Sequence, residues 1–164
     1  GGVAAVAWEE EAALREVVVA VVTPAATSVA AVASSASGQY APRLAWSGDD
    51  LWATWVEDGR VRAAVRRAGQ PRFDPPLDLT SGGSWAPDIG AADGEVTVAW
   101  EQWTASDARV LMAPLTPAGP GATRPLDEAP GPARRAALAP GSWGGLHAAW
   151  SARGAIWTRA RRAR

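Results

Sequence analysis

The fold is decided by the segment Glu95-Val96-Thr97-Val98-Ala99-Trp100, because a short hydrophobic run that ends in tryptophan occurs four times along the chain. The other three runs are Val3-Ala4-Ala5-Val6-Ala7-Trp8, Leu51-Trp52-Ala53-Thr54-Trp55 and Leu146-His147-Ala148-Ala149-Trp150. Their final tryptophans are 47, 45 and 50 residues apart (55 − 8, 100 − 55 and 150 − 100). A repeat of this length is typical of an array of supersecondary units.

Alternation within each run indicates a β-strand with two different faces. In a strand, the tryptophan and the residue two places before it share a face, and the residue directly before it lies on the other face. That residue is small in every run, being Ala7, Thr54, Ala99 or Ala149. Sheets with one bulky and one small face can pack on copies of themselves without voids. We therefore expect sheets stacked face to face, and the four repeated tryptophans in the core.

Turn signals divide each unit into strands. The second unit predicts four strands, with Asp58-Gly59 as a hairpin turn between the second and third. The expected strands of that unit are 42–47, 51–57, 60–67 and 77–80. The third unit predicts an inner strand from Ala86-Pro87 onward, followed by 95–102, 109–115 and a weak strand over 122–126. The first unit predicts 3–8, 16–22 and 29–33, and the last 134–138, 146–151 and 155–163. The helical-looking stretch 9–16 is interpreted as a hairpin connection.

These strands predict an all-β fold, a β-propeller of four-stranded antiparallel blades with about three and a half blades in this chain. One domain, 1–164, would comprise a partial blade 1–38, blades 39–81 and 82–129, and a partial blade 130–164. An open arc leaves two blade faces bare, and proteins avoid bare faces and edges. We expect a part of a longer chain or assembly, or a homo-oligomer; a compact four-bladed ring is the alternative.

Composition limits the class of protein. The formal net charge is −1, which favours no nucleic-acid partner, and there is no cysteine. All 16 basic residues are arginine, a bias typical of a GC-rich bacterial genome. The uncharged stretch 17–42 is interrupted by Pro24 and polar clusters, so we expect no membrane span. The single histidine, His147, has no partners that suggest a metal site, and no motif indicates a cofactor.

One inter-strand segment gives a family resemblance. Residues 67–79 read Arg-Ala-Gly-Gln-Pro-Arg-Phe-Asp-Pro-Pro-Leu-Asp-Leu. This segment resembles a degenerate Asp-box (BNR) turn of the sialidase-like propellers, in which Gly69 and Phe73 keep the glycine and aromatic positions while the polar serine and aspartate are absent. The passage from Ser81 to Glu101 is similar to the link between blades in that family. The resemblance implies a propeller, and it says little of activity because one fold serves many functions.

Sialidases use an arginine cluster, a tyrosine–glutamate nucleophile pair and an aspartic acid, so the resemblance directs attention to the starts of the inner strands. Tyr40 is the only tyrosine, and Arg43, Asp88 and Arg135 occupy similar positions near the starts of three inner strands. These four residues are candidates for a polar ligand pocket at the central mouth. We assign no catalytic residue, because the other carboxylates, among them Glu57, Asp58 and Glu101, are expected to be solvated turn residues.

Tryptophans at strand ends are further ligand candidates, because exposed aromatic rings stack on sugars. They are Trp46, Trp85 and Trp143; anchoring of loops is the alternative role. The sequence thus favours a non-catalytic binding or scaffold module of a secreted, periplasmic or cell-surface bacterial protein, with a carbohydrate or protein partner. A fragment of a sialidase-like glycoside hydrolase, or a structural subunit that closes through blade edges, are the alternatives.

Overall fold

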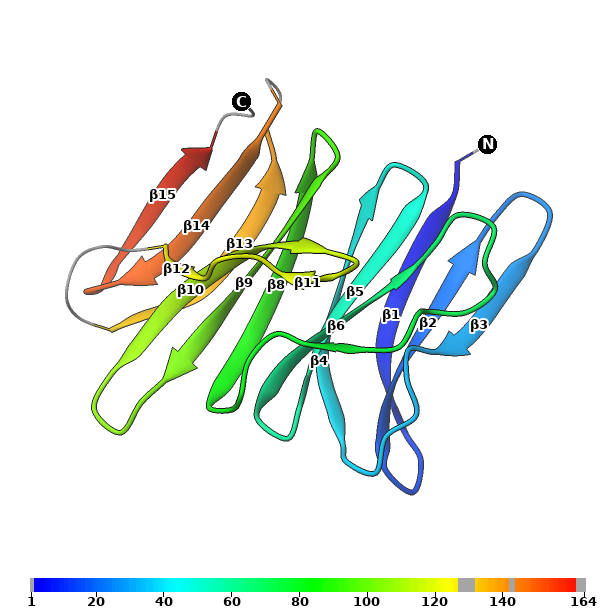
Figure 1. Cartoon of the computed structure of the whole chain (residues 1–164), viewed down its shortest axis with the longest axis horizontal. Coiled ribbons are helices and arrows are strands. Elements are labelled where there is room, and N and C mark those ends of the chain that lie inside the picture. Colours follow the sequence, from blue (N-terminus) through cyan, green and yellow to red (C-terminus); the bar gives the residue numbers. More distant parts are fainter. Residues whose placement is uncertain (1, 127–131, 142–143, 162–164) are drawn as a thin grey trace.

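A computed structural model of the chain describes residues 2–126, 132–141 and 144–161. In these residues every regular element is a β-strand, and the strands form four antiparallel sheets that follow one another along the sequence. Figure 1 shows the sheets in a row, with β1–β3 at one end and β13–β15 at the other. The all-β prediction is therefore confirmed.

The strands of each sheet are consecutive in the sequence. Sheet 1 comprises β1 (Ala4–Glu11), β2 (Arg15–Val22) and β3 (Thr27–Ala31). Sheet 2 comprises β4 (Gln39–Ser47), β5 (Asp50–Glu57), β6 (Arg60–Arg66) and β7 (Leu77–Asp78). Sheet 3 comprises β8 (Ser84–Ala92), β9 (Glu95–Trp103), β10 (Ala108–Thr116), β11 (Gly119–Pro120) and β12 (Arg124–Pro125). Sheet 4 comprises β13 (Ala133–Pro140), β14 (Leu146–Ala152) and β15 (Ala155–Arg161).

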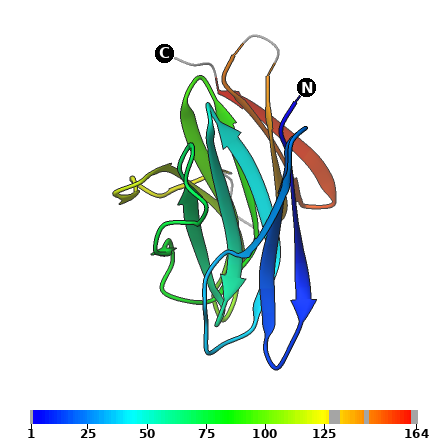
Figure 2. The same cartoon turned by 90° about the vertical axis from the view of Figure 1, so that its right-hand side faces the viewer.

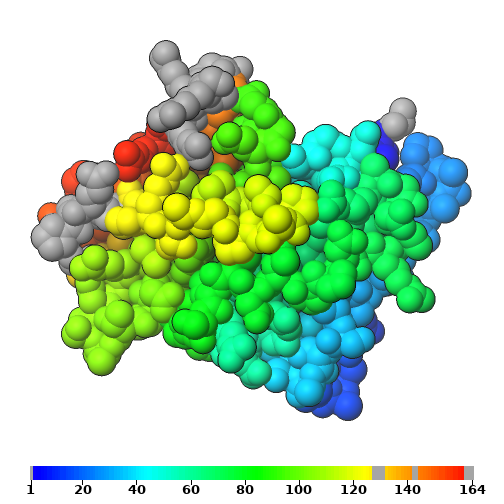
Figure 3. Space-filling model, in the orientation of Figure 1, coloured from blue at the N-terminus to red at the C-terminus, as the bar shows by residue number. Residues whose placement is uncertain are grey.

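The predicted strand order agrees with these sheets, with one difference at the outer edge of sheet 3. The single weak strand expected over 122–126 is replaced by β11 and β12, which pair with different parts of β10. Proline occupies one of the two positions in each of these short strands, and proline has no N–H to donate to a ladder. Figure 3 shows this segment on the surface in front of sheet 3. The stretch 9–16 forms the β1–β2 hairpin as expected.

The first strands of sheets 2, 3 and 4 share a bulge that was not predicted. The ladder register shifts between Tyr40 and Arg43, and at the corresponding places in β8 and β13. A residue with positive φ lies in each bulge, namely Ala41 (53°), Ala86 (47°) and Arg135 (53°). Because of the bulge, these strands begin before the predicted starts. The strands β4, β8 and β13 contact one another in that order, so the bulges lie in one row.

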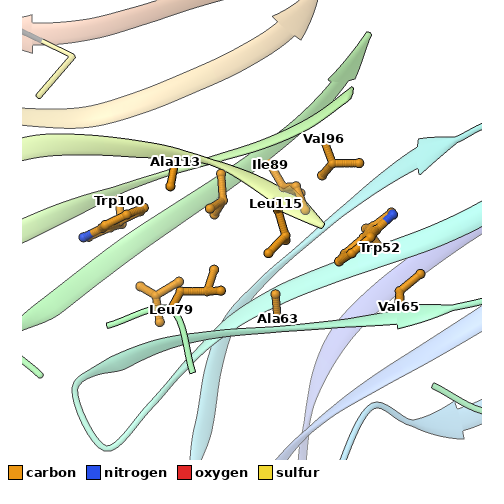
Figure 4. Packing of buried hydrophobic residues seen from close by; sticks show 11 residues of the cluster. Trp52, Ala63, Val65, Leu79, Ile89, Val96, Trp100, Ala113 and Leu115 are labelled. Atoms are coloured by element: carbon orange, nitrogen blue, oxygen red, sulfur yellow. The ribbon is translucent and has the colours of Figure 1, made fainter. Parts of the chain in front are cut away.

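The four sheets stack with their faces in one consistent direction. We call the face that carries the repeated tryptophan the rear face of a sheet, and the opposite face its forward face. Trp55 is buried in one cluster with Val17 and Val19 of β2, so the rear face of sheet 2 packs on the forward face of sheet 1. Trp100 joins Val61 of β6 in the next cluster, which Figure 4 shows in part. Trp150 joins Val110 of β10 in the third.

The prediction that all four repeated tryptophans lie in the core is wrong for the one at the end of the row. Trp55, Trp100 and Trp150 are 0%, 2% and 6% exposed, whereas Trp8 is 36% exposed. Trp8 lies on the rear face of sheet 1, and no described residue packs a further sheet against that face. Figure 2 looks along the row from the end at which sheet 1 lies.

Candidate binding site

Asp88 is the centre of the polar contacts between the first strands. Its Oδ2 accepts a hydrogen bond of 2.6 Å from the Leu138 backbone N–H in β13, and its Oδ1 lies 3.7 Å from Arg43 Nε in β4. The side chain of Asp88 is 18% exposed and that of Arg43 is 55% exposed. Asp88 therefore links three neighbouring sheets, and Arg43 is the solvent-facing member of the pair.

The environment of Asp88 raises the pKa of its carboxyl. Burial is the largest cause, because a desolvated carboxyl favours its neutral form. Hydrogen bonds from the backbone of Leu138 and Ile89, and the charge of Arg43, lower the pKa and offset only part of that effect. The packing of the protein around Asp88 is thus sufficient to explain its raised pKa.

Tyr40 and Arg135, the other two candidates at the strand starts, have partners of their own. The Arg15 guanidinium lies over the ring of Tyr40, 5.0 Å from its centroid. The backbone N–H of Arg135 donates a hydrogen bond of 2.8 Å to Glu101 Oε1. The structure thus pairs Arg43 with Asp88, while Tyr40 and Arg135 lie against different neighbours.

Two carboxylates expected in solvated turns are in fact buried. Glu57 is 7% exposed and accepts hydrogen bonds from Ser35 Oγ (2.6 Å), Trp55 Nε1 (3.1 Å) and Arg62 Nη1 (2.9 Å). Glu101 is 6% exposed and accepts hydrogen bonds from Trp103 Nε1 and the bulge N–H of Arg135. The expectation was wrong because neighbouring segments pack over the ends of β5 and β9 and supply donors to the carboxylates.

The pKa of Glu57 lies below its ordinary value. Burial is the largest single influence and raises it. The hydrogen bonds from Ser35 and Trp55, followed by the charge and hydrogen bond of Arg62, together outweigh that influence and favour the carboxylate. Glu57 is thus held as an anion at neutral pH and serves as a structural acceptor.

A cavity of about 570 Å³ lies where the β4–β5 turn meets the end of β6 and the edge of sheet 1. Trp46, Asp49, Arg66 and Arg67 line it with a polar rim, and Val21 contributes apolar surface. Trp46 is 36% exposed, so part of its indole ring is accessible to a ligand. Of the predicted tryptophan candidates, Trp46 is the one that this cavity includes.

The arginines of this cavity are oriented by neighbouring side chains. Arg67 Nε lies 3.1 Å from Asp74 Oδ2, and Arg67 Nη1 lies 3.8 Å from Asp50 Oδ2. Arg66 Nη1 donates a weak hydrogen bond of 3.4 Å to Ser28 Oγ of sheet 1. Arg67 is thereby held by two carboxylates, whereas Arg66 makes only this long hydrogen bond to the described residues. The sequence placed Trp46 at a strand end, but only the fold brings residues 66 and 67 beside it.

The remaining two tryptophan candidates differ in position. Trp85 is 48% exposed and lies beside the Gly59 turn of the preceding sheet, away from this cavity. Trp143 lies outside the described residues.

Among the described residues, no three histidine, aspartate or glutamate side chains are grouped so as to hold a metal ion. No helix in the described part of the chain has the length and apolar character needed to cross a bilayer. No protein-family model matches the chain, and no curated protein matches its sequence.

Proposed function

We propose that this chain is a segment of a sialidase-like β-propeller and acts as a non-catalytic carbohydrate-binding module of a secreted or cell-surface bacterial protein. The propeller assignment is supported by four antiparallel sheets that stack in sequence order, with β4, β8 and β13 next to one another. In a propeller, the corresponding strands of successive blades line the central channel.

The observation that carries the binding proposal is the half-exposed Trp46 in a cavity with two arginines and an aspartate. An indole ring gives a flat apolar surface for the C–H face of a sugar. Arginine donors and an aspartate acceptor can orient hydroxyl groups, and arginine pairs with carboxylates. This combination suits an oligosaccharide that carries a carboxylate, for which Arg66 is the available cation.

We favour binding over sialidase-like hydrolysis, because the candidate residues for hydrolysis each lie against a different partner. A sialidase site would gather arginines and a tyrosine around one substrate carboxylate. Here Arg43 lies against Asp88, Tyr40 against Arg15, and the backbone of Arg135 against Glu101. These separate partners support a binding module whose ligand site lies elsewhere.

The test is a titration of the chain with a neutral and a uronic-acid-containing oligosaccharide, followed by tryptophan fluorescence and calorimetry. Trp46→Ala should weaken binding at least about tenfold, which corresponds to about 1.4 kcal/mol. Trp85→Ala is the matched control and should bind as the wild type does. Arg66→Gln should weaken binding of the acidic sugar more than that of the neutral one. Equal binding by Trp46→Ala and the wild type would contradict the proposal.

A further inference from the structure

The same combination of buried residues occurs at each of the three boundaries between sheets. A valine on the forward face of one sheet is buried in the same cluster as the tryptophan on the rear face of the next. The three pairs are Val17 with Trp55, Val61 with Trp100, and Val110 with Trp150. The valines are 0%, 0% and 1% exposed. This pair of residues is therefore the common element of the stacking.

The two end faces carry the unmatched halves of this pair. On the forward face of sheet 4, Ile156 occupies the position of the three valines, because it pairs with the residue after Trp150 as Val61 pairs with the residue after Trp55. Ile156 is 74% exposed. On the rear face of sheet 1, Trp8 is 36% exposed and Val6 is 56% exposed. One end offers the aliphatic residue, and the other offers the tryptophan.

The end faces also differ in shape. The forward face of sheet 4 has a cavity of about 570 Å³, lined by Ile156, Ala137 and Ala149 among others. The rear face of sheet 1 carries bulky residues instead, Trp8 and Val6. A bulky face against a small one is the pattern of the three internal boundaries, so the two ends are complementary in shape to each other and each is poorly suited to a copy of itself.

The two end faces also carry charged residues of opposite sign. On the rear face of sheet 1, Glu10 and Glu16 lie directly opposite each other in the β1–β2 ladder, and like charges so placed are destabilising. The cavity of sheet 4 is bordered by Arg135 and by Arg134, whose guanidinium lies 4.4 Å from the Trp103 ring centroid. Apart from His147, arginine is the only ionisable residue type within 132–164. The rear face of sheet 1 thus carries glutamates, and the cavity on the forward face of sheet 4 is bordered by arginines.

We propose that the forward face of sheet 4 in one copy of this chain binds the rear face of sheet 1 in a second copy, with Ile156 of the first copy against Trp8 of the second. Such a contact is heterologous, because it joins two different surfaces, and it forms a ring where the rotation closes. Two copies would bring eight sheets together, which is within the range of known propeller rings. This proposal concerns assembly and is independent of the sugar site.

The first test is the native mass of the chain by light scattering and sedimentation at several protein concentrations. We expect twice the chain mass of 17.0 kDa, or a larger multiple. Val6→Glu and Ile156→Glu should each give monomers at concentrations at which the wild type is assembled. Both positions are more than half exposed, so circular dichroism should report unchanged strand content. Added salt should weaken assembly, because it screens the contact between the glutamates and arginines.

Mixing the two variants is the sharper test. Val6→Glu retains an intact forward face on sheet 4, and Ile156→Glu retains an intact rear face on sheet 1. An equimolar mixture should therefore form a one-to-one dimer, although each variant alone is monomeric. If the interface joined two identical faces, mixing the two variants would not restore assembly between them. Trp85→Glu, which lies on neither end face, is the control and should assemble as the wild type does.

Three results would overturn the proposal. The first is a wild-type chain that stays monomeric at the highest concentration reached. The second is a single end-face variant that assembles as the wild type does. The third is a mixture of the two variants that remains monomeric.

Discussion

Trp8 and Trp55 end the same sequence pattern in neighbouring sheets, yet their surroundings are opposite. Trp55 is fully buried, and its Nε1 donates to Glu57, whereas Trp8 is 36% exposed at the end of the row. Both tryptophans lie on the rear face of a strand that pairs with the strand following it in the chain. The repeat therefore determines which face of a strand is apolar. Whether that face is buried in the core depends on a preceding sheet that packs against it.

A similar contrast exists among the three boundaries. The residue after the repeated tryptophan is Glu9 in sheet 1 and Glu101 in sheet 3, and each carboxylate accepts the bulge N–H of the following sheet, from Ala41 (2.9 Å) and Arg135 (2.8 Å) respectively. In sheet 2 this residue is Val56, which has no side-chain acceptor. The outer two boundaries therefore share a carboxylate-to-bulge hydrogen bond between sheets, whereas at the central boundary the Arg43–Asp88 ion pair joins the first strands instead.

The largest effect is expected from truncating the two tryptophans. Trp55→Ala should lower the free energy of unfolding by about 3–5 kcal/mol, because it opens a cavity in a packed core. Trp8→Ala should cost only about 1–2 kcal/mol, because part of its surface is already in water and the site can collapse. Urea unfolding, followed by circular dichroism, measures both values.

The comparison needs a background in which the proposed contact between copies cannot form. Both substitutions are therefore made together with Ile156→Glu, so that Trp8 has no partner in a second copy. Equal losses at the two positions would show that Trp8 is as well packed as Trp55, and that the rear face of sheet 1 is covered.

A smaller effect is expected from the two carboxylate-to-bulge hydrogen bonds. Glu101→Ala should cost about 1–3 kcal/mol, because Glu101 is only 6% exposed and its loss leaves the part-buried Arg135 N–H and Trp103 indole N–H without their acceptor. Glu9→Ala should cost about 1 kcal/mol or less, because the Glu9 side chain is 34% exposed and water can replace it. Unfolding measurements on both variants, made in the Ile156→Glu background, decide which loss is larger. A larger loss for Glu9→Ala would contradict the role given to burial.

The strand pattern could be predicted from the sequence because every unit repeats the same signals. Alternation before Trp100, the small residue before it and the Asp58-Gly59 turn are local features, and local features fix strands and hairpins. Face-to-face stacking of the sheets also follows from them, since a bulky face packs without voids on a small one. These are the parts of the fold that the structure confirms.

The polar contacts could not be predicted, because they join residues far apart in the sequence. The acceptors of the bulge N–H groups, Glu9 and Glu101, lie 32 and 34 residues before their donors. The burial of Glu57 depends on Ser35 and Gln39 of the preceding segment. The cavity at Trp46 likewise needs sheet 1 beside the end of β6. Residue type gives no sign of these neighbours until the sheets are stacked.

The carboxyls of Asp88 and Glu57 should respond to pH in opposite directions, and this is the smallest of the three effects. The folded state raises the pKa of Asp88 above its ordinary 3.8, so the folded chain binds the proton more tightly than the unfolded chain does. Stability from this group is therefore present at low pH and falls as the pH rises from about 3.8 through the higher folded pKa. Asp88→Asn removes that loss, so its stability relative to the wild type should improve over the same interval.

Glu57 has the reverse sign, because its folded pKa lies below the ordinary 4.5. Its contribution is present above 4.5 and is lost as the pH falls through the lower folded pKa. Glu57→Gln should therefore differ most from the wild type near neutral pH, and the difference should shrink in acid. Urea unfolding of both variants from about pH 3 to about pH 7 should give two difference curves of opposite slope. Parallel curves would contradict one of the two pKa shifts. The shift of Asp88 depends on the packing of β4, β8 and β13 around it, so that packing would be the part of the fold to re-examine.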